Sequence, residues 1–364
     1  MKSETIRCLS PSSLLGLLGG DFAGQSDTLV VTSYLKGLAI AAVVALHYTG
    51  ALFTDKVSGS ANLVVSVFFL LSGYGIFYSL ENRVRRQRAT GRMLLGFYAS
   101  RAVRVLPLLW VALLLDSLTS GRVYTPADFS GNPVFPIPFI YWFVSYVIQC
   151  YIAAPVLWVL LKRVGWRRYS VLVLAFLAVT YAISVTSLDR FAVYEYAHLS
   201  LGHLILFSFG MAIPTIVSDR KAFRTDKYTT PMFFVFFVLL LVFSLPAVAP
   251  WSSLPVYLAP LFLVSVSAFC LSAIGGNRCL PLSGIIALVG TYSYSVYLFH
   301  LIFYFALQRA GIAERESFAS IILIVLLLPI FFFVCLVAEK ASTSACDRLM
   351  AWTGRVFRRL TEVT

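Results

Sequence analysis

The chain contains few charged residues, and acidic ones are especially rare. Only 12% of its 364 residues are Asp, Glu, Lys or Arg, with 16 acidic against 29 basic side chains, and 59% are hydrophobic. Soluble domains carry about a quarter charged residues, so this composition excludes a soluble globular protein. The high apolar and aromatic content also excludes intrinsic disorder. What remains is the composition of a membrane protein.

Histidine and cysteine are scarce as well. The four histidines and six cysteines show no CxxC or Cys/His spacing typical of a metal site, so we expect no metal. Each cysteine is expected within a helix or on the cytoplasmic side, and therefore without a disulfide. The net charge of +13 is explained by the basic residues that accumulate in cytoplasmic loops of membrane chains, so we expect no nucleic-acid partner.

Ten apolar stretches predict an all-α integral membrane protein, a polytopic bundle of about ten transmembrane helices. A span needs roughly 20 apolar residues, and in lipid its backbone groups must bond within the segment. The predicted organisation is an N-terminal cytoplasmic segment (1–28), one transmembrane domain (29–340) and a basic cytoplasmic tail (341–364). The predicted spans lie near 29–53, 61–80, 97–118, 138–161, 169–186, 199–217, 231–248, 255–274, 283–308 and 317–339.

The basic residues fall in alternate loops. They concentrate at 83–92, 162–168, 220–227 and 278 and in the tail, whereas the intervening loops hold few. This asymmetry predicts that both termini are cytoplasmic. We expect a multi-pass protein of the cell membrane, the inner membrane in a bacterium. The outer loop at 119–138 is rich in Pro and Gly, which predicts irregular structure.

Ionisable residues inside spans are costly in lipid and are functional candidates by default. Counted at 1.5 Å per residue, three histidines lie at a common level, roughly 21–24 Å from the inner side. Imidazole suits general base chemistry because its unperturbed pKa lies near neutrality. A structural role is the alternative for each histidine and for Asp116. The candidates are Lys36, His47, Arg101, Arg104, Asp116, His203 and His300.

Two arginines lie toward the cytoplasmic end of the third span. Arg101 and Arg104 are three residues apart and share a helix face. Two guanidinium groups on one face favour phosphate binding. The alternative is that they extend to lipid headgroups. Taken alone, these residues fit a phosphate-bearing donor on the inside and a base toward the outside, and they fit an ion or lipid transporter almost as well.

Five sequence blocks, in order, resemble the acyltransferase 3 family of integral membrane acyltransferases, which includes bacterial O-antigen and peptidoglycan O-acetyltransferases. The resemblance covers about residues 30–340. The blocks are Tyr34-Leu-Lys36-Gly-Leu-Ala-Ile40 with His47, Phe68-Phe-Leu-Leu-Ser72-Gly73-Tyr74, Phe97-Tyr-Ala-Ser-Arg101-Ala-Val-Arg104-Val-Leu-Pro107, Tyr141-Trp142-Phe-Val-Ser145, and Ser293-Tyr294-Ser-Val-Tyr297-Leu-Phe-His300.

The resemblance implies transfer of an acyl group, often acetyl, from cytoplasmic acyl-CoA to a hydroxyl of a cell-surface or lipid-linked carbohydrate. It implies that His47 is the catalytic base and that the arginine motif binds the donor. His300 would orient the acceptor or stabilise the oxyanion. No permanently bound cofactor is expected; membrane lipids surround the protein. Further substrate-binding candidates are Lys36, Ser72, Tyr141, Trp142 and His203.

The chain departs from the family pattern at several positions. Lys36 replaces the usual arginine and cannot form a bidentate fork. Val147 and Ile148 stand where many members carry acidic residues, which puts the acceptor in doubt. The alternatives are packing for Ser72 and an aromatic-belt role for Tyr141 and Trp142. For the mechanism, the alternative is an acyl-enzyme route. For the function of the protein, the alternatives are a transporter or flippase for a glycan, lipid or acylated metabolite, and a non-catalytic scaffold.

Overall fold

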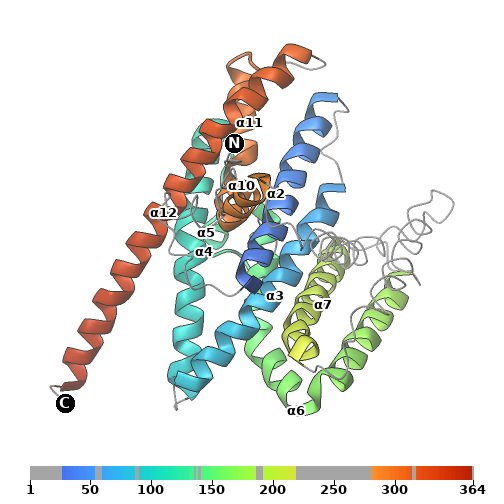
Figure 1. Cartoon of the computed structure of the whole chain (residues 1–364), viewed down its shortest axis with the longest axis vertical. Coiled ribbons are helices and arrows are strands. Elements are labelled where there is room, and N and C mark those ends of the chain that lie inside the picture. The colour runs from blue at the N-terminus through green and yellow to red at the C-terminus, as the bar shows by residue number, and fades with distance from the viewer. Residues whose placement is uncertain are drawn as a thin grey trace, which may run out of the picture. The chain divides into compact units, whose positions relative to one another are not determined.

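The computed structural model describes residues 27–53, 60–86, 90–134, 137, 141–185, 192–218, 281–313 and 317–362. This part of the chain is helical and contains no strand. The helices are α2 (Asp27–Phe53), α3 (Ser60–Arg86), α4 (Thr90–Ser120), α5 (Pro126–Phe129), α6 (Trp142–Val185), α7 (Ala192–Ser218), α10 (Pro281–Thr291), α11 (Ser293–Arg309) and α12 (Phe318–Glu362), as Figure 1 shows.

Four of these helices are long and apolar enough to cross a membrane, or five if α10 and α11 together form one broken span. They occur at Val64–Arg85, Met93–Ser120, Trp142–Phe176 and Phe318–Cys346. A membrane protein built of helices is therefore confirmed. The predicted spans 231–248 and 255–274 lie outside the described residues, as does the segment 1–26.

Two of the predicted spans differ from the helices of the structure. The stretch 283–308 is interrupted at Tyr292, so it forms α10 and α11 rather than one straight helix. The stretches 138–161 and 169–186, by contrast, correspond to the two helical parts of α6, which are separated by a kink with non-helical backbone at Gly165 (φ 77°, ψ 158°). Glycine adopts this conformation without the steric penalty that a Cβ brings. The helix α12 continues without a break past residue 340 to Glu362 and appears in Figure 1 as one long rod.

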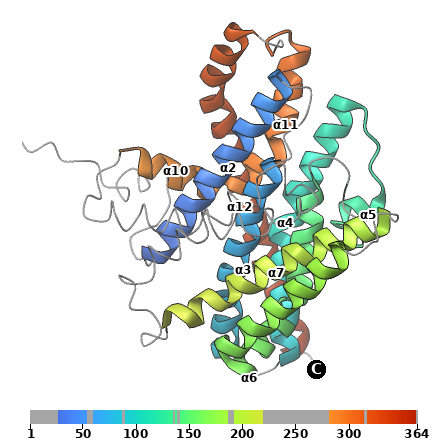
Figure 2. The same ribbon diagram turned by 90° about the vertical axis from the view of Figure 1, so that its right-hand side faces the viewer.

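The chain divides into two compact units. Unit 1 comprises Met1–Glu81 and Ala153–Ser293, and unit 2 comprises Asn82–Ile152 and Tyr294–Thr364. In unit 1, α10 lies across α2 (Figure 2), and their backbones meet at Gly290. A Cβ there would lie 1.6 Å from the Ser33 carbonyl oxygen, so only glycine permits this approach. The helices α3 and α7 meet in the same way at Gly73 and Gly210.

In unit 2, α11 and α12 are tied to α4. Tyr294 donates a hydrogen bond to the Val105 carbonyl (2.9 Å), and the thiol of Cys346 lies 3.0 Å from the Val103 carbonyl. At the start of α11, the hydroxyl of Ser295 donates to the Glu339 carboxylate on α12 (2.7 Å). Since all three bonds involve buried or half-buried groups, they fix which faces of these helices meet.

The loop between α4 and α6 is more ordered than the sequence predicted. It contains the short helix α5, whose N-cap is Thr125. The Thr125 hydroxyl accepts from the Asp128 amide, and the Asp128 carboxylate accepts from the Thr125 amide, which completes a capping box. Further bonds hold the loop to its flanking helices, from the Trp110 indole to the Phe129 carbonyl (2.6 Å) and from Gln149 to the Pro133 carbonyl (2.8 Å). The prediction of irregular structure was therefore wrong for α5.

Candidate functional site

His47 lies on α2 and is only 7% exposed. Its Nδ1 is 2.9 Å from the carbonyl oxygen of Val43, one turn earlier in the same helix. A carbonyl can only accept, so Nδ1 carries the proton and the lone pair of a neutral imidazole is on Nε2. The helix thereby fixes both the ring orientation and the tautomer, and it leaves Nε2 as the basic nitrogen.

Lys36 stands on the same face of α2 as His47. The two residues are 11 positions apart, which is close to three helical turns and about 16 Å along the axis. Lys36 is half-buried. Unit 1 thus carries one cation and one imidazole along a single helix face.

The other two candidates of unit 1 lie where α3 meets α7. The ring of His203 on α7 stacks against Phe69 of the second sequence block, with centroids 4.2 Å apart, and His203 is 2% exposed. Ser72 is half-buried on α3 beside Gly73, whose backbone touches Phe207. These contacts place both residues in a packed helix interface.

Arg101 and Arg104 project from α4 in unit 2. The Arg101 guanidinium lies over the rings of Phe97 (5.6 Å) and Tyr151 (6.0 Å), at distances typical of cation–π contacts. Arg101 is half-buried, whereas Arg104 is exposed. The aromatic rings limit where the Arg101 side chain points, and Arg104 remains accessible to a ligand.

A third arginine was assigned to a charged loop by its position in the sequence, but it lies against the same helix. Arg83, near the end of α3, donates from Nη2 to the Ser100 hydroxyl on α4 (2.8 Å). Its charge acts on Arg101, as does that of Arg104. The two contact residues are 17 positions apart across a short connection, so no local spacing pattern could have identified the pair.

His300 is fully buried in α11. Its Nδ1 is 2.7 Å from the Tyr297 carbonyl, so its lone pair, like that of His47, is on Nε2. The ring of Tyr297 contacts Phe143 at the start of α6 (4.9 Å). Because the chain bends by 82° between α10 and α11, residues 283–300 do not form one straight helix, and His300 lies about 10 Å along α11. His47 and His300 belong to different units.

Tyr141 and Trp142 begin α6 in the same unit. The Tyr141 side chain is fully buried, and its hydroxyl has no hydrogen-bond partner in the part of the chain that the structure describes. Trp142 is half-buried, with its ring against Tyr146 (5.7 Å). A fully buried tyrosine offers no face for stacking on a sugar, so only Trp142 remains accessible for that role.

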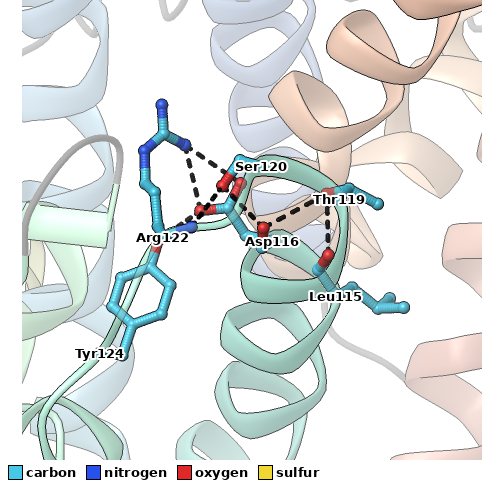
Figure 3. A network of polar contacts seen from close by, with 6 residues as sticks. All are labelled: Leu115, Asp116, Thr119, Ser120, Arg122 and Tyr124. Carbon is cyan, nitrogen blue, oxygen red and sulfur yellow. Dashed lines mark hydrogen bonds and ion pairs between the residues drawn. The ribbon is translucent and has the colours of Figure 1, made fainter.

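Asp116 is the centre of a polar network at the end of α4 (Figure 3). Its carboxylate is 1% exposed and accepts from Arg122 Nη1 at 3.1 Å on each oxygen. It also accepts from the Tyr124 hydroxyl. Burial and this hydrogen bond raise the pKa of Tyr124, so the phenol stays protonated and donates at neutral pH. The network ties the loop to α4, and the six-residue separation of Asp116 and Arg122 is the signal that could have revealed it.

These features define a helical membrane protein with a buried, oriented imidazole in one unit and clustered arginines in the other. The family model for the acyltransferase 3 domain, described as an acyltransferase domain, matches residues 33–340. This covers most of the chain, so the chain belongs to that family and is a membrane acyltransferase. No curated protein and no solved structure shows significant similarity to it.

Proposed function

We propose that this protein transfers an acyl group, acetyl in the simplest case, from cytoplasmic acyl-CoA to a hydroxyl of a cell-surface or lipid-linked carbohydrate. The proposal includes about ten spans with both termini in the cytoplasm, in the inner membrane of a bacterium. It is supported by the family membership, by the arginines of α4 and by the fixed tautomer of His47. The last of these carries the argument, because direct transfer needs a base, and the Nδ1–H bond to the Val43 carbonyl places the lone pair of the neutral ring on Nε2.

In the proposed reaction, Nε2 of His47 removes the proton of the acceptor hydroxyl as its oxygen attacks the thioester carbonyl. The new C–O bond forms, the C–S bond breaks, and the CoA thiolate takes the proton back from the imidazolium. The phosphates of the donor bind Arg101 and Arg104, with Lys36 as a further cation. His300 stabilises the developing oxyanion or orients the acceptor.

The test follows transfer from acyl-labelled acetyl-CoA in membranes that contain the natural acceptor. His47→Gln keeps a polar side chain of similar size but removes the base. Ala41→Gln places the same amide at an exposed position of α2 and serves as the control. We expect His47→Gln to lower transfer by at least about 100-fold at equal protein abundance, as loss of a general base does. Ala41→Gln should retain transfer.

Each outcome separates the candidates. Equal transfer by wild type and His47→Gln would remove His47 as the base. Release of CoA with the label recovered on a molecule other than a carbohydrate would indicate another acceptor class, and label recovered as free acetate would indicate hydrolysis. If acceptor-rich membranes containing the wild type consume no thioester, the donor is wrong, and the flippase alternative can be tested by movement of the glycan across the membrane.

A further inference from the structure

The guanidinium of Arg83 is held in a defined position by α4. Its Nη2 donates to Oγ of Ser100 at 2.8 Å, while the same hydroxyl donates to the Phe97 carbonyl at 2.8 Å. The Ser100 proton is therefore committed to the backbone, and its oxygen is left as an acceptor for the arginine. Arg83 is a half-buried side chain with a specific partner, unlike a basic residue that only marks topology.

The backbone of α4 leaves room for this arginine. A Cβ at Gly96 would lie 3.2 Å from Nη1 of Arg83, which is a tight contact. Gly96 and Ser100 are one turn apart on the same helix face. Arg83 thus crosses α4 at a level between these two residues.

Three guanidinium groups gather at this part of unit 2. Arg83 and Arg104 are both close enough for their charges to act on Arg101. Neither Arg83 nor Arg104 pairs with a carboxylate in the described ranges, unlike Arg122, which pairs with Asp116, and Lys162, which pairs with Glu81. Like charges in a partly buried site repel one another, and a bound anion removes that cost. The cluster therefore has the charge and accessibility of an anion site.

Along the axis of α4, the levels of the three guanidinium groups follow the order of the phosphates in a nucleotide thioester. The level of Arg83, between Gly96 and Ser100, is nearer the start of α4 at Thr90 than that of Arg104. On the predicted orientation that start faces the cytoplasm. An acyl-CoA that enters with its acyl end leading has its diphosphate farther in and the 3′-phosphate of its adenosine nearest the entrance.

We propose that Arg83 is a third donor-binding residue, which binds the 3′-phosphate of acyl-CoA while Arg101 and Arg104 bind the diphosphate. This inference rests on the proposed use of acyl-CoA as the donor. In this role Arg83 is a specificity residue that distinguishes CoA thioesters from donors lacking the 3′-phosphate. Ser100 is the residue that positions the Arg83 guanidinium.

The experiment measures equilibrium binding of acetyl-CoA and of its 3′-dephospho analogue to the purified full-length protein in nanodiscs of zwitterionic lipid. Arg83→Ala should weaken acetyl-CoA binding about tenfold, the effect of one charge-assisted pair, and leave the analogue unchanged. Ser100→Ala should show a smaller loss with the same selectivity. Arg85→Ala removes an equal charge from an exposed position two residues away and should change neither affinity.

The possible failures can be told apart. Absence of acetyl-CoA binding by the wild type would refute the proposed donor itself. Binding by the wild type that Arg83→Ala leaves unchanged would refute only the role of Arg83, and equal losses for both ligands would refute the assignment to the 3′-phosphate. The same phosphate chemistry is offered by lipid headgroups. If Arg83→Ala weakens retention of phosphatidylglycerol but not of acetyl-CoA, the site binds lipid and the inference is wrong.

Discussion

Replacing Gly73 by alanine tests how α3 and α7 pack in unit 1. A Cβ at this position would lie 2.0 Å from the Phe207 carbonyl oxygen, 2.9 Å from its carbonyl carbon and 3.0 Å from the Met211 amide nitrogen. All three atoms belong to the backbone of α7, so no side chain can turn aside. The opposing glycine, Gly210, makes the reciprocal approach: a Cβ added there would lie 1.9 Å from the Leu70 carbonyl oxygen.

The expected cost follows from this geometry. The contact is about 1.4 Å short of the 3.4 Å at which ordinary van der Waals distances begin, so the helices must separate at their crossing point. Overpacked cores lose about 1–3 kcal/mol when side chains can adjust. Here a helix backbone must move, so we expect at least about 3 kcal/mol. The rise in helix propensity from glycine to alanine, about 1 kcal/mol, offsets only part of it.

A control for this prediction lies two residues away. Gly75 is in the same helix and the same sequence block, but a Cβ there meets nothing within 4 Å. Thermal unfolding of the purified variants in one detergent should show a marked loss for Gly73→Ala, and no loss or a small gain for Gly75→Ala. If both variants unfold at the wild-type temperature, the close approach of α3 and α7 is not as described and the packing argument fails.

Two further pairs of substitutions test unit 2 by the same unfolding measurement. Arg122→Gln leaves the Asp116 carboxylate buried without its cation and should lower the free energy of unfolding by about 3 kcal/mol. Adding Asp116→Asn should recover much of this loss. A double variant as unstable as Arg122→Gln alone would contradict the prediction. Cys346→Ala should lower the free energy of unfolding by about 1 kcal/mol, because the Val103 carbonyl loses a donor. Pro107→Ala should reduce that cost, because it restores an amide donor within α4. An unchanged cost in the Pro107→Ala background would refute this account.

The sequence predicted the class of fold because hydrocarbon imposes strong constraints on a chain. Apolar length and the requirement for internal hydrogen bonds are enough to predict membrane helices, and the short motif blocks identified the family. Helix interruptions were harder to predict. The break at Tyr292 falls within the polar run Gly290-Thr-Tyr292-Ser-Tyr-Ser295, which the predicted span 283–308 included as part of one helix, and no proline marks it. Conversely, Pro155 lies inside α6 without ending it.

At the candidate site, residues with a local signal were found and those with a distant partner were not. The pair Arg101 and Arg104 was visible because its spacing defines a helix face. Arg83 was hidden because its partner, Ser100, is on the next helix. The burial of Tyr141 was not predictable either, since an aromatic residue near a span end has the same sequence signature whether it faces lipid, ligand or core.

Pro107 explains why the arginine motif depends on residues far along the chain. A proline within a helix has no amide hydrogen, so the carbonyl four residues earlier, that of Val103, loses its partner within α4. The Cys346 thiol lies against that carbonyl, 243 positions along the chain. Tyr294, 189 positions along, donates to the carbonyl of Val105. These two carbonyls flank Arg104, so α11 and α12 hold the backbone on both sides of a proposed donor-binding residue. The proline thereby creates the acceptor through which the C-terminal helix is attached to the arginine motif.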